Sequence, residues 1–311
     1  MRIMMTGATG FVGKPLCERL LEEGHSVAAL TRDAQRAQGV LGPRITCLSW
    51  GGENDTEWRQ ALGDVDAIVN LAGESVGGAR WTEAYKRKIY DSRILTTRAL
   101  VEAMRLQQTR PRALICASAV GYYGDRKDEI VTEESLPGTD FLATTCRDWE
   151  AEAGKAAALG VRVACLRLGI VLGKGGALEK MLYPLPLPVS PFKLGLGGPI
   201  GSGGQWFPWI HLDDVIGLFA WAATTDAPQG AFNATAPNPV TNAEFVHTIG
   251  RILHRPAVAP VPGFALKLAL GEFAEALLGG QRAFPTAAQK AGYRFRHENL
   301  EETLRALMAN P

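Results

Sequence analysis

The chain begins with Met1-Arg-Ile-Met-Met-Thr-Gly7-Ala-Thr-Gly10-Phe-Val-Gly13, and this stretch decides the fold. A short apolar run leads into three glycines, and an apolar helical pattern follows at once. Strand, glycine turn and helix in this order are typical of the first βα unit of a dinucleotide-binding domain. The first glycine permits a tight turn, the second lets the backbone approach a pyrophosphate, and the third lets helix and strand pack closely. The amides that open the helix then face the phosphates with the positive end of the helix dipole. The loop residues expected to hold the cofactor are Gly7, Thr9, Gly10, Phe11, Val12 and Gly13.

The second apolar run, residues 26–31, ends in Thr31, Arg32 and Asp33. In a βαβ nucleotide site this position meets the adenine ribose, where an acidic residue binds the 2′-hydroxyl and an arginine suits a 2′-phosphate. The guanidinium of Arg32 can clamp phosphate oxygens beside the Thr31 hydroxyl. Asp33 keeps the unphosphorylated cofactor open, although it also suits the N-cap of a following helix, and Arg32 could instead be a solvated surface charge. We predict NADP(H) as the cofactor, with Thr31 and Arg32 among its contacts.

Short apolar runs and helical patterns alternate over the first 170 residues. Strands this short and apolar are typical of a parallel sheet that helices cover on both faces. Right-handed crossovers then give a Rossmann-like, doubly wound α/β sheet, in which ligands bind beyond the carboxyl ends of the strands. The predicted strands are residues 3–5, 27–30, 45–48, 67–70, 113–117 and 161–166, and the predicted helices are residues 14–23, 82–107 and 143–159.

Bulk composition narrows the class of protein. The 311 residues carry 33 lysines and arginines against 32 acids, a net charge of +1, which gives no electrostatic footprint for nucleic acid or an anionic membrane. Hydrophobic residues make up 46%, enough for a sizeable core, and no apolar run is long enough to span a bilayer. The five cysteines are scattered without a C-x-x-C pair, and the five histidines show no metal-ligand spacing. We therefore expect a cytoplasmic, metal-free protein with buried free thiols.

The amino-acid composition of the sequence changes after residue 170. Residues 182–208 are rich in proline and glycine yet apolar, which indicates an irregular substrate-side segment or lid. Thr241 and Glu244 form a capping box that opens a helix, and Asn299 precedes a last amphipathic helix. These segments predict a smaller, partly helical C-terminal substrate lobe. The predicted division is a cofactor domain over residues 1–170, to which part of 206–236 returns, and a substrate lobe over 171–205 and 237–311.

Eight motifs follow one another in a specific order along the whole chain. They are Thr6–Gly13, Asn70–Glu74, Arg80-Trp81 with Lys86 downstream, Ser92–Ile94, Ser118–Gly124, Arg167–Gly173, Trp206–Asp214 and Gly280–Arg282. Together they resemble the extended branch of the short-chain dehydrogenase/reductase superfamily and, more narrowly, the atypical NAD(P)-dependent epimerase family typified by YfcH. The resemblance implies a Rossmann-like domain that binds NADP(H), an appended C-terminal domain and a small-molecule substrate.

The resemblance also implies site residues beyond the glycine loop. Leu71, Ala72 and Gly73 would lie along the adenine-side ribose and the phosphates. Leu168 and Gly169 would contribute backbone contacts. Glu74 would either reach the site or cap a turn, and Ser118 would stand near the nicotinamide as a catalytic residue. The segment from His211 to Asp214 would tie the substrate lobe back to the sheet.

The superfamily's usual Tyr-x-x-x-Lys pair is missing where we expect it. A tyrosine would shuttle the proton, and a lysine four residues later would share its helix face and lower its pKa. In the helix that begins near residue 143, Thr145 or Cys146 stands at the tyrosine position, and Trp149 or Glu150 at the lysine position. Cys146 is better interpreted as a buried thiol, whereas Trp149 could wall the nicotinamide pocket or pack in the core.

One Tyr-x-x-x-Lys match exists elsewhere, at Tyr123 and Lys127, in a stretch that reads as a loop. Without a helix the spacing gives no shared face. Tyr123 could still line the substrate cleft and transfer a proton, or it could be a packing residue. The aromatic cluster of Trp206, Phe207 and Trp209 likewise suits either a substrate rim or the packing of one lobe on another.

Two functions therefore remain open at this stage. The first is an oxidoreductase or epimerase acting on a hydroxyl or carbonyl carbon, with Ser118 polarising the oxygen and Tyr123 or an ordered water transferring the proton. The second is a non-catalytic NADPH-binding redox sensor, which the missing pair favours. A homodimer through the long charged helix that starts near Thr82 is also possible.

Overall fold

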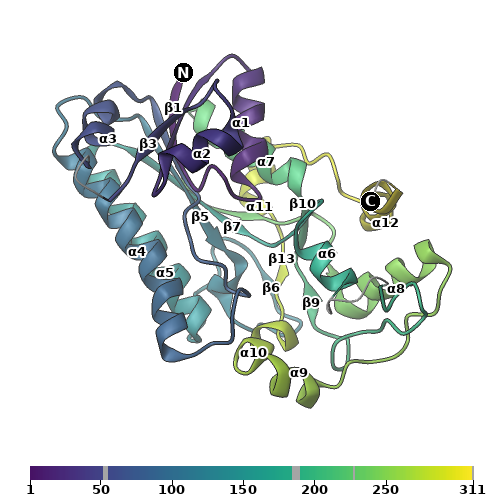
Figure 1. Ribbon diagram of the computed structural model, residues 1–311. Helices are drawn as coiled ribbons and strands as arrows, with labels where there is room; N and C mark the ends of the chain where they lie inside the picture. The colour runs from purple at the N-terminus through teal and green to yellow at the C-terminus, as the bar shows by residue number, and fades with distance from the viewer. Residues whose placement is uncertain (52–54, 184–189, 227, 310–311) are drawn as a thin grey trace.

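The computed structural model describes residues 1–51, 55–183, 190–226 and 228–309. Its centre is a seven-stranded sheet in which every neighbouring pair is parallel, with the order β3-β2-β1-β4-β5-β7-β11 (Figure 1). The predicted Rossmann-like fold is confirmed. The seventh strand comes from the segment predicted to return to the cofactor domain. The strands are β1 (Arg2–Thr6), β2 (Ser26–Thr31), β3 (Thr46–Ser49), β4 (Ala67–Asn70), β5 (Ala113–Ala119), β7 (Arg162–Leu168) and β11 (Gly230–Ala234).

Helices cover both faces of this sheet, α4 and α5 on one face and α1 and α7 on the other (Figure 1). The sequence predicted the first three of these, except that α5 ends earlier and continues as the 3-10 helix η3 (Lys155–Leu159). It missed α2 and α3, which at 8 and 7 residues are shorter than the window of roughly 11–18 residues over which helical periodicity can be recognised. The helices of this part are α1 (Gly13–Glu22), α2 (Ala34–Leu41), α3 (Asp55–Ala61), α4 (Glu83–Arg105), α5 (Phe141–Gly154) and α7 (Leu212–Thr224).

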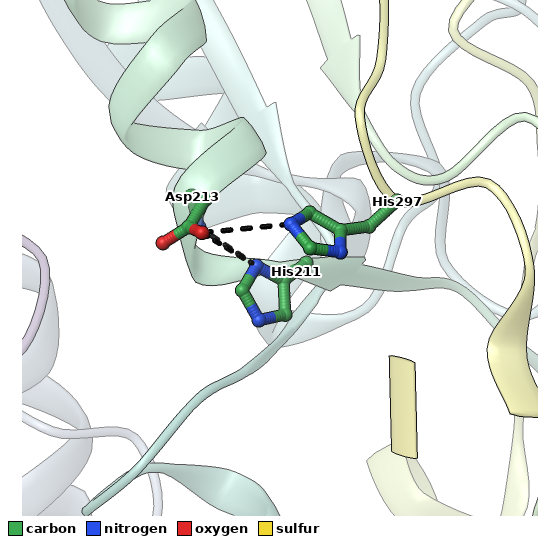
Figure 2. A group of neighbouring side chains, drawn as sticks. All are labelled: His211, Asp213 and His297. Atoms are coloured by element: carbon green, nitrogen blue, oxygen red, sulfur yellow. Dashed lines mark hydrogen bonds and ion pairs between the residues drawn. The ribbon is translucent and has the colours of Figure 1, made fainter. Parts of the chain in front are cut away.

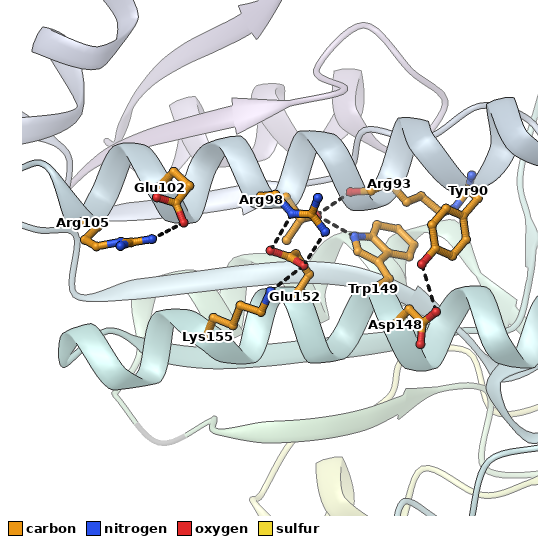
Figure 3. A network of polar contacts seen from close by, with 10 residues as sticks. Tyr90, Arg93, Arg98, Glu102, Arg105, Asp148, Trp149, Glu152 and Lys155 are labelled. Carbon is orange, nitrogen blue, oxygen red and sulfur yellow. Dashed lines mark hydrogen bonds and ion pairs between the residues drawn. The ribbon is translucent and has the colours of Figure 1, made fainter.

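One face of α4 is occupied within the chain, because it packs along α5 (Figure 3). Arg98 binds Glu152 at the exposed rim, and the Tyr90 hydroxyl donates to Asp148 at 3.0 Å. Between them the buried Trp149 indole donates to Thr97 at 2.9 Å, so Trp149 is a packing residue of the α4–α5 interface. Pairing of α4 across a homodimer remains a prediction.

A second apolar cluster lies beside the sheet and belongs to a smaller lobe. Thr241 caps α8 by accepting from Glu244 N, and Asn299 accepts from Glu302 N at the start of α12, as the sequence predicted. Residues 184–189 of the predicted lid lie outside the described residues. The elements of this lobe are β8 (Ile170–Leu172), α6 (Ala177–Leu182), β9 (Trp206–Phe207), β10 (Trp209–His211), β12 (Val240–Thr241), α8 (Asn242–Leu253) and α12 (Leu300–Ala309).

Two residues of the predicted substrate lobe, Ala288 of α11 and Phe295, are buried in the larger apolar cluster. The division of the chain into two lobes remains a prediction. A short parallel pair, β6 and β13, also joins the C-terminal region to the loop after β5. None of the helices in the described ranges is both long and apolar enough to cross a bilayer. The remaining elements are η1 (Leu62–Asp64), η2 (Val120–Tyr123), β6 (Ile130–Val131), α9 (Gly263–Leu270), α10 (Phe273–Leu278), β13 (Arg282–Ala283) and α11 (Thr286–Lys290).

Candidate functional site

The glycine loop between β1 and α1 has the backbone geometry of a phosphate cradle. Gly7 adopts φ +67°, which favours glycine, and Gly10 N donates to Gly7 O at 3.0 Å to close the turn. A Cβ on Gly13 would overlap the Gly7 carbonyl, so the start of the helix packs directly on the turn. A Cβ on Gly10 would meet only that same carbonyl, at 3.1 Å, and Gly10 is otherwise exposed. The loop therefore leaves its outer side open to a diphosphate.

The loop after β4 lies against the glycine loop. The Thr6 hydroxyl donates to Asn70 Oδ1 at 2.7 Å and accepts from the backbone N–H groups of Leu71 and Ala72 at 3.1 Å each. A Cβ on Gly7 would lie 2.9 Å from the Leu71 carbonyl carbon. Because the strand order reverses between β1 and β4, the two loops meet at the crevice where doubly wound sheets bind ligands.

The end of this second loop is anchored on α4. Glu74 N donates to Ser92 Oγ at 2.9 Å, and Arg93 Nη1 donates to Glu74 O at 3.0 Å. A Cβ on Gly73 would lie 2.9 Å from Arg93 Cζ, so that position needs glycine for the guanidinium to pack there. The Glu74 carboxylate meets Lys88 at 3.2 Å, and this hydrogen bond holds the pKa of Glu74 below its usual value.

At the carboxyl end of β2, the structure shows that Asp33 caps a helix, one of the two roles that its sequence position suggested. Asp33 Oδ1 accepts from Arg36 N at 2.9 Å and caps α2, so its carboxylate is engaged in starting a helix. Arg32 is exposed and makes no hydrogen bond or ion pair with another residue of the described ranges. Thr31 Oγ1 accepts from Asp33 N at 3.4 Å. Arg32 is thus the group at this edge that is available for an anionic ligand.

Three further residues of the predicted cofactor set, Phe11, Leu168 and Gly169, lie in the glycine loop and at the end of β7. Phe11 packs against Gly173 and Gly176 after β8, since a Cβ on either glycine would collide with its ring. Gly169 N donates to Ala234 O at 2.9 Å, and its Cα lies against the Pro208 carbonyl. Leu168 is half-buried at the end of β7.

A compact polar cluster lies at the carboxyl ends of β5 and β7. Ser118 Oγ donates to Glu150 Oε1 at 2.6 Å. Arg167 holds the same carboxylate through Nε at 2.8 Å and Nη2 at 2.7 Å, a bidentate pair whose side chains are 5% and 14% exposed. Burial disfavours the charged guanidinium, but the hydrogen bonds and charge of Glu150 outweigh it and raise the pKa of Arg167. The Glu150 carboxylate therefore accepts hydrogen bonds from both Ser118 and Arg167.

Tyr123 is buried beside the Ser118 cluster. Only 1% of its surface is exposed, its hydroxyl donates to Asn233 Oδ1 at 2.7 Å, and it accepts from Arg167 Nη1 at 2.8 Å. Burial raises its pKa to about 12. Because both sides of its hydroxyl are engaged, the structure favours the interpretation of Tyr123 as a packing residue, and its role in proton transfer stays a prediction.

Residues at the two expected positions of the missing pair surround Ser118. The Cys146 thiol interacts with the Ser118 hydroxyl, and burial raises the pKa of Cys146 to about 11. Glu150 lies one turn further along α5. Sequence reasoning placed Glu150 at the lysine position but gave it no role, and it gave Arg167 none either. The opposite charges of Glu150 on α5 and Arg167 at the end of β7 were the sequence signal that could have indicated this ion pair.

Two of the three clustered aromatic side chains are packing residues, one of the two interpretations that the sequence allowed. Phe207 stacks on Phe245 with ring centroids 4.2 Å apart, and Trp209 is 1% exposed with its indole donating to Asn238 O. Both therefore pack the smaller lobe. Trp206 remains partly exposed and carries the Arg282 guanidinium over its ring at 4.4 Å.

The comparisons with known proteins match nearly the whole chain. The profile of the NAD dependent epimerase/dehydratase family matches residues 3–234, and that of a domain of unknown function, DUF1731, matches residues 261–307. Epimerase family protein YfhF of Bacillus subtilis is 40% identical over 311 residues, covering 100% of this chain and 99% of its own.

Two solved structures extend this similarity. Human epimerase family protein SDR39U1, crystallised with NADPH, superposes with a TM-score of 0.85 at 33% identity and covers 100% of both chains. A nucleoside-diphosphate sugar epimerase from Corynebacterium glutamicum gives a TM-score of 0.75 at 33% identity, covering 99% of this chain and 58% of its own.

Proposed function

Because the chain belongs to the NAD dependent epimerase/dehydratase family, we propose that it is an NADP(H)-dependent oxidoreductase or epimerase. Its substrate would be a small molecule with a hydroxyl or carbonyl carbon, of the sugar-nucleotide kind. The single observation that carries the chemistry is the 2.6 Å hydrogen bond from Ser118 to Glu150 at the carboxyl end of β5. The relative crystallised with NADPH and the nucleoside-diphosphate sugar epimerase support the cofactor and the substrate class.

The cofactor would lie across the crevice between the glycine loop and the loop after β4. Backbone amides at the start of α1 would hold the diphosphate, with Gly10 giving it room. Arg32, which is exposed and unpaired among the described residues, would bind the 2′-phosphate. When bound, the nicotinamide would exchange a hydride with the substrate carbon.

Ser118 would hold the substrate oxygen. Its own proton is directed at Glu150, so its free lone pairs can accept from a substrate hydroxyl. As the hydride leaves the substrate carbon, the substrate proton would pass to Ser118 and the Ser118 proton to Glu150. Arg167 would fix the orientation of the Glu150 carboxylate through its two hydrogen bonds. Ser118 and Glu150 would thereby replace the tyrosine and lysine of the related enzymes.

The test is NADP(H) absorbance at 340 nm with a panel of carbonyl compounds and sugar nucleotides. Ser118→Ala should lower kcat by about 100-fold or more while NADPH affinity stays within about threefold. Ser202→Ala, at an exposed hydroxyl that only accepts from Gly204 N, is the matched control. Tyr123→Phe separates the two proton routes, because it should retain turnover. Loss of turnover in Tyr123→Phe with turnover kept in Ser118→Ala would refute this assignment.

A second candidate, a non-catalytic NADPH-binding sensor, has one specific observation in its favour. Ser118 is 2% exposed and Tyr123 is 1% exposed, so neither hydroxyl faces open solvent. Tight NADPH binding by calorimetry, combined with no turnover across the whole panel, would support the sensor. Turnover that disappears in Ser118→Ala would exclude it.

A further inference from the structure

Three potential metal ligands converge where β10 runs into α7. Asp213 Oδ2 lies 3.7 Å from His211 Nδ1 and 3.5 Å from His297 Nε2, and one ligand atom from each residue falls within 4.8 Å of the others (Figure 2). The two imidazole rings lie with their centroids 3.8 Å apart and their planes tilted by 31°, and a nitrogen of each faces the carboxylate. His297 follows α11 and lies far from the other two residues in the sequence, so only the fold assembles the group.

The backbone around the cluster is held in place independently of the cluster itself. Asp214 is fully buried, and its carboxylate accepts from Arg296 N at 2.8 Å and from His297 N at 3.0 Å. These charge-assisted bonds fix the C-terminal segment against the first turn of α7. His211 is fixed as the N-cap of the same helix, where Nδ1 accepts from Asp213 N at 3.1 Å. The backbone of His297 is therefore held in place by Asp214, whereas His211 Nδ1 must release its hydrogen bond from Asp213 N before it can bind an ion.

The donor set and the access suit a divalent transition metal. Two imidazole nitrogens and one carboxylate oxygen are ligands that zinc-class ions accept, at distances of about 2.0–2.2 Å. Ligands of a tetrahedral ion at that distance lie roughly 3.3 Å apart, close to the two separations seen here. Asp213 is 54% exposed and His297 27% exposed, so an ion can enter from solvent and keep a water in a fourth position.

The geometry points to a binding site for a divalent transition-metal ion formed by His211, Asp213 and His297. To bind the ion, His211 Nδ1 would give up the hydrogen bond that it now accepts from Asp213 N. Metal binding would therefore compete with the capping of α7 by His211. It would link the start of α7 to the C-terminal segment that Asp214 already holds. The site is separate from the Ser118 cluster and does not depend on the proposed cofactor chemistry.

The test titrates Co²⁺ into the full chain after chelator treatment and gel filtration, following the visible d–d absorption and the melting temperature. We expect one Co²⁺ per chain, displacement by Zn²⁺ and a higher melting temperature with metal. Asp213→Asn keeps the shape of a half-exposed side chain and should weaken Co²⁺ binding by about tenfold or more, as should His297→Ala. His211→Ala is avoided because His211 is buried and caps α7.

The control is His247→Ala, which removes an exposed histidine of α8 outside the cluster and should leave Co²⁺ affinity unchanged. Chemical denaturation of each variant without metal shows that it is folded. Absence of one-to-one Co²⁺ binding would overturn the site. Equal Co²⁺ affinity in the unaltered chain, Asp213→Asn and His297→Ala would show adventitious binding only and would overturn it as well.

Discussion

The glycine loop and the Ser118 cluster lie at the same edge of the sheet but are built in opposite ways. The loop is made by backbone atoms from one continuous stretch, in which Gly7, Gly10 and Gly13 each meet a steric requirement within seven residues. The cluster is made by side chains of β5, α5 and β7, which meet only because these elements pack together. The shape of the loop depends on no side chain, whereas the cluster exists only when all three side chains are present.

This difference predicts which property, ligand binding or the stability of the fold, a substitution in each region should change. A change in the loop alters the space for a phosphate and leaves the packed core intact. A change in the cluster leaves a buried charge without its partner, and the cost then appears in the stability of the fold. Binding and stability should therefore respond separately in the two regions.

The largest effect is expected for Arg167→Met. It removes the bidentate partner of Glu150 and one hydrogen bond of the Tyr123 hydroxyl. A buried carboxylate left without its cation costs about 3–5 kcal/mol. Chemical denaturation should show a free energy of unfolding lower by that amount.

The matched control for this change is Arg98→Met. Arg98 also meets a glutamate, Glu152, but its side chain is 51% exposed and Lys155 remains beside the same carboxylate (Figure 3). The loss should stay within about 1 kcal/mol. Equal losses in the two variants would show that the cluster is no more than an ordinary ion pair.

Next in size is Gly10→Val, which tests the loop. The added side chain would occupy the open outer side of the turn, so NADPH affinity should fall at least about 100-fold, equivalent to roughly 2.7 kcal/mol. The melting temperature should change little, because the Cβ meets only the Gly7 carbonyl. Gly39→Val, at an exposed glycine of α2 with nothing within 4 Å, is the control. Retained affinity in Gly10→Val would remove the loop from the cofactor site.

A smaller effect is expected for Arg32→Asp. If Arg32 binds the 2′-phosphate, its reversal should weaken NADPH binding by about 1–3 kcal/mol and leave NADH binding nearly unchanged. Calorimetry with both dinucleotides measures the ratio. An unchanged ratio of NADPH to NADH affinity contradicts this role, because the two cofactors differ at that phosphate.

The smallest effect belongs to Asp33→Ala. It deletes the acceptor for Arg36 N at the start of α2, which should cost about 1 kcal/mol of stability without weakening NADPH binding. Denaturation and calorimetry on the same sample report both quantities. A clear loss of NADPH affinity would mean that Asp33 also contacts the cofactor.

Features that depend on neighbours in the sequence were predictable. The six predicted strands, the capping residues Thr241 and Asn299 and the positions of the loop glycines all follow from local periodicity or backbone geometry. Tyr123 shows the opposite case. Its sequence neighbours place it next to Ser118, but only the packing of Asn233 and Arg167 around its hydroxyl reveals that it is buried.

By itself, the sequence determined much of the backbone of this protein: a βα unit with a glycine turn, a parallel sheet and the capped start of α8. Short-range sterics and hydrogen bonds dictate those features, so they can be read from adjacent residues. Only the tertiary structure decided which charged and polar side chains meet. The Glu150–Arg167 pair and the group of His211, Asp213 and His297 join distant segments, because burial and long-range packing, rather than local order, bring them together.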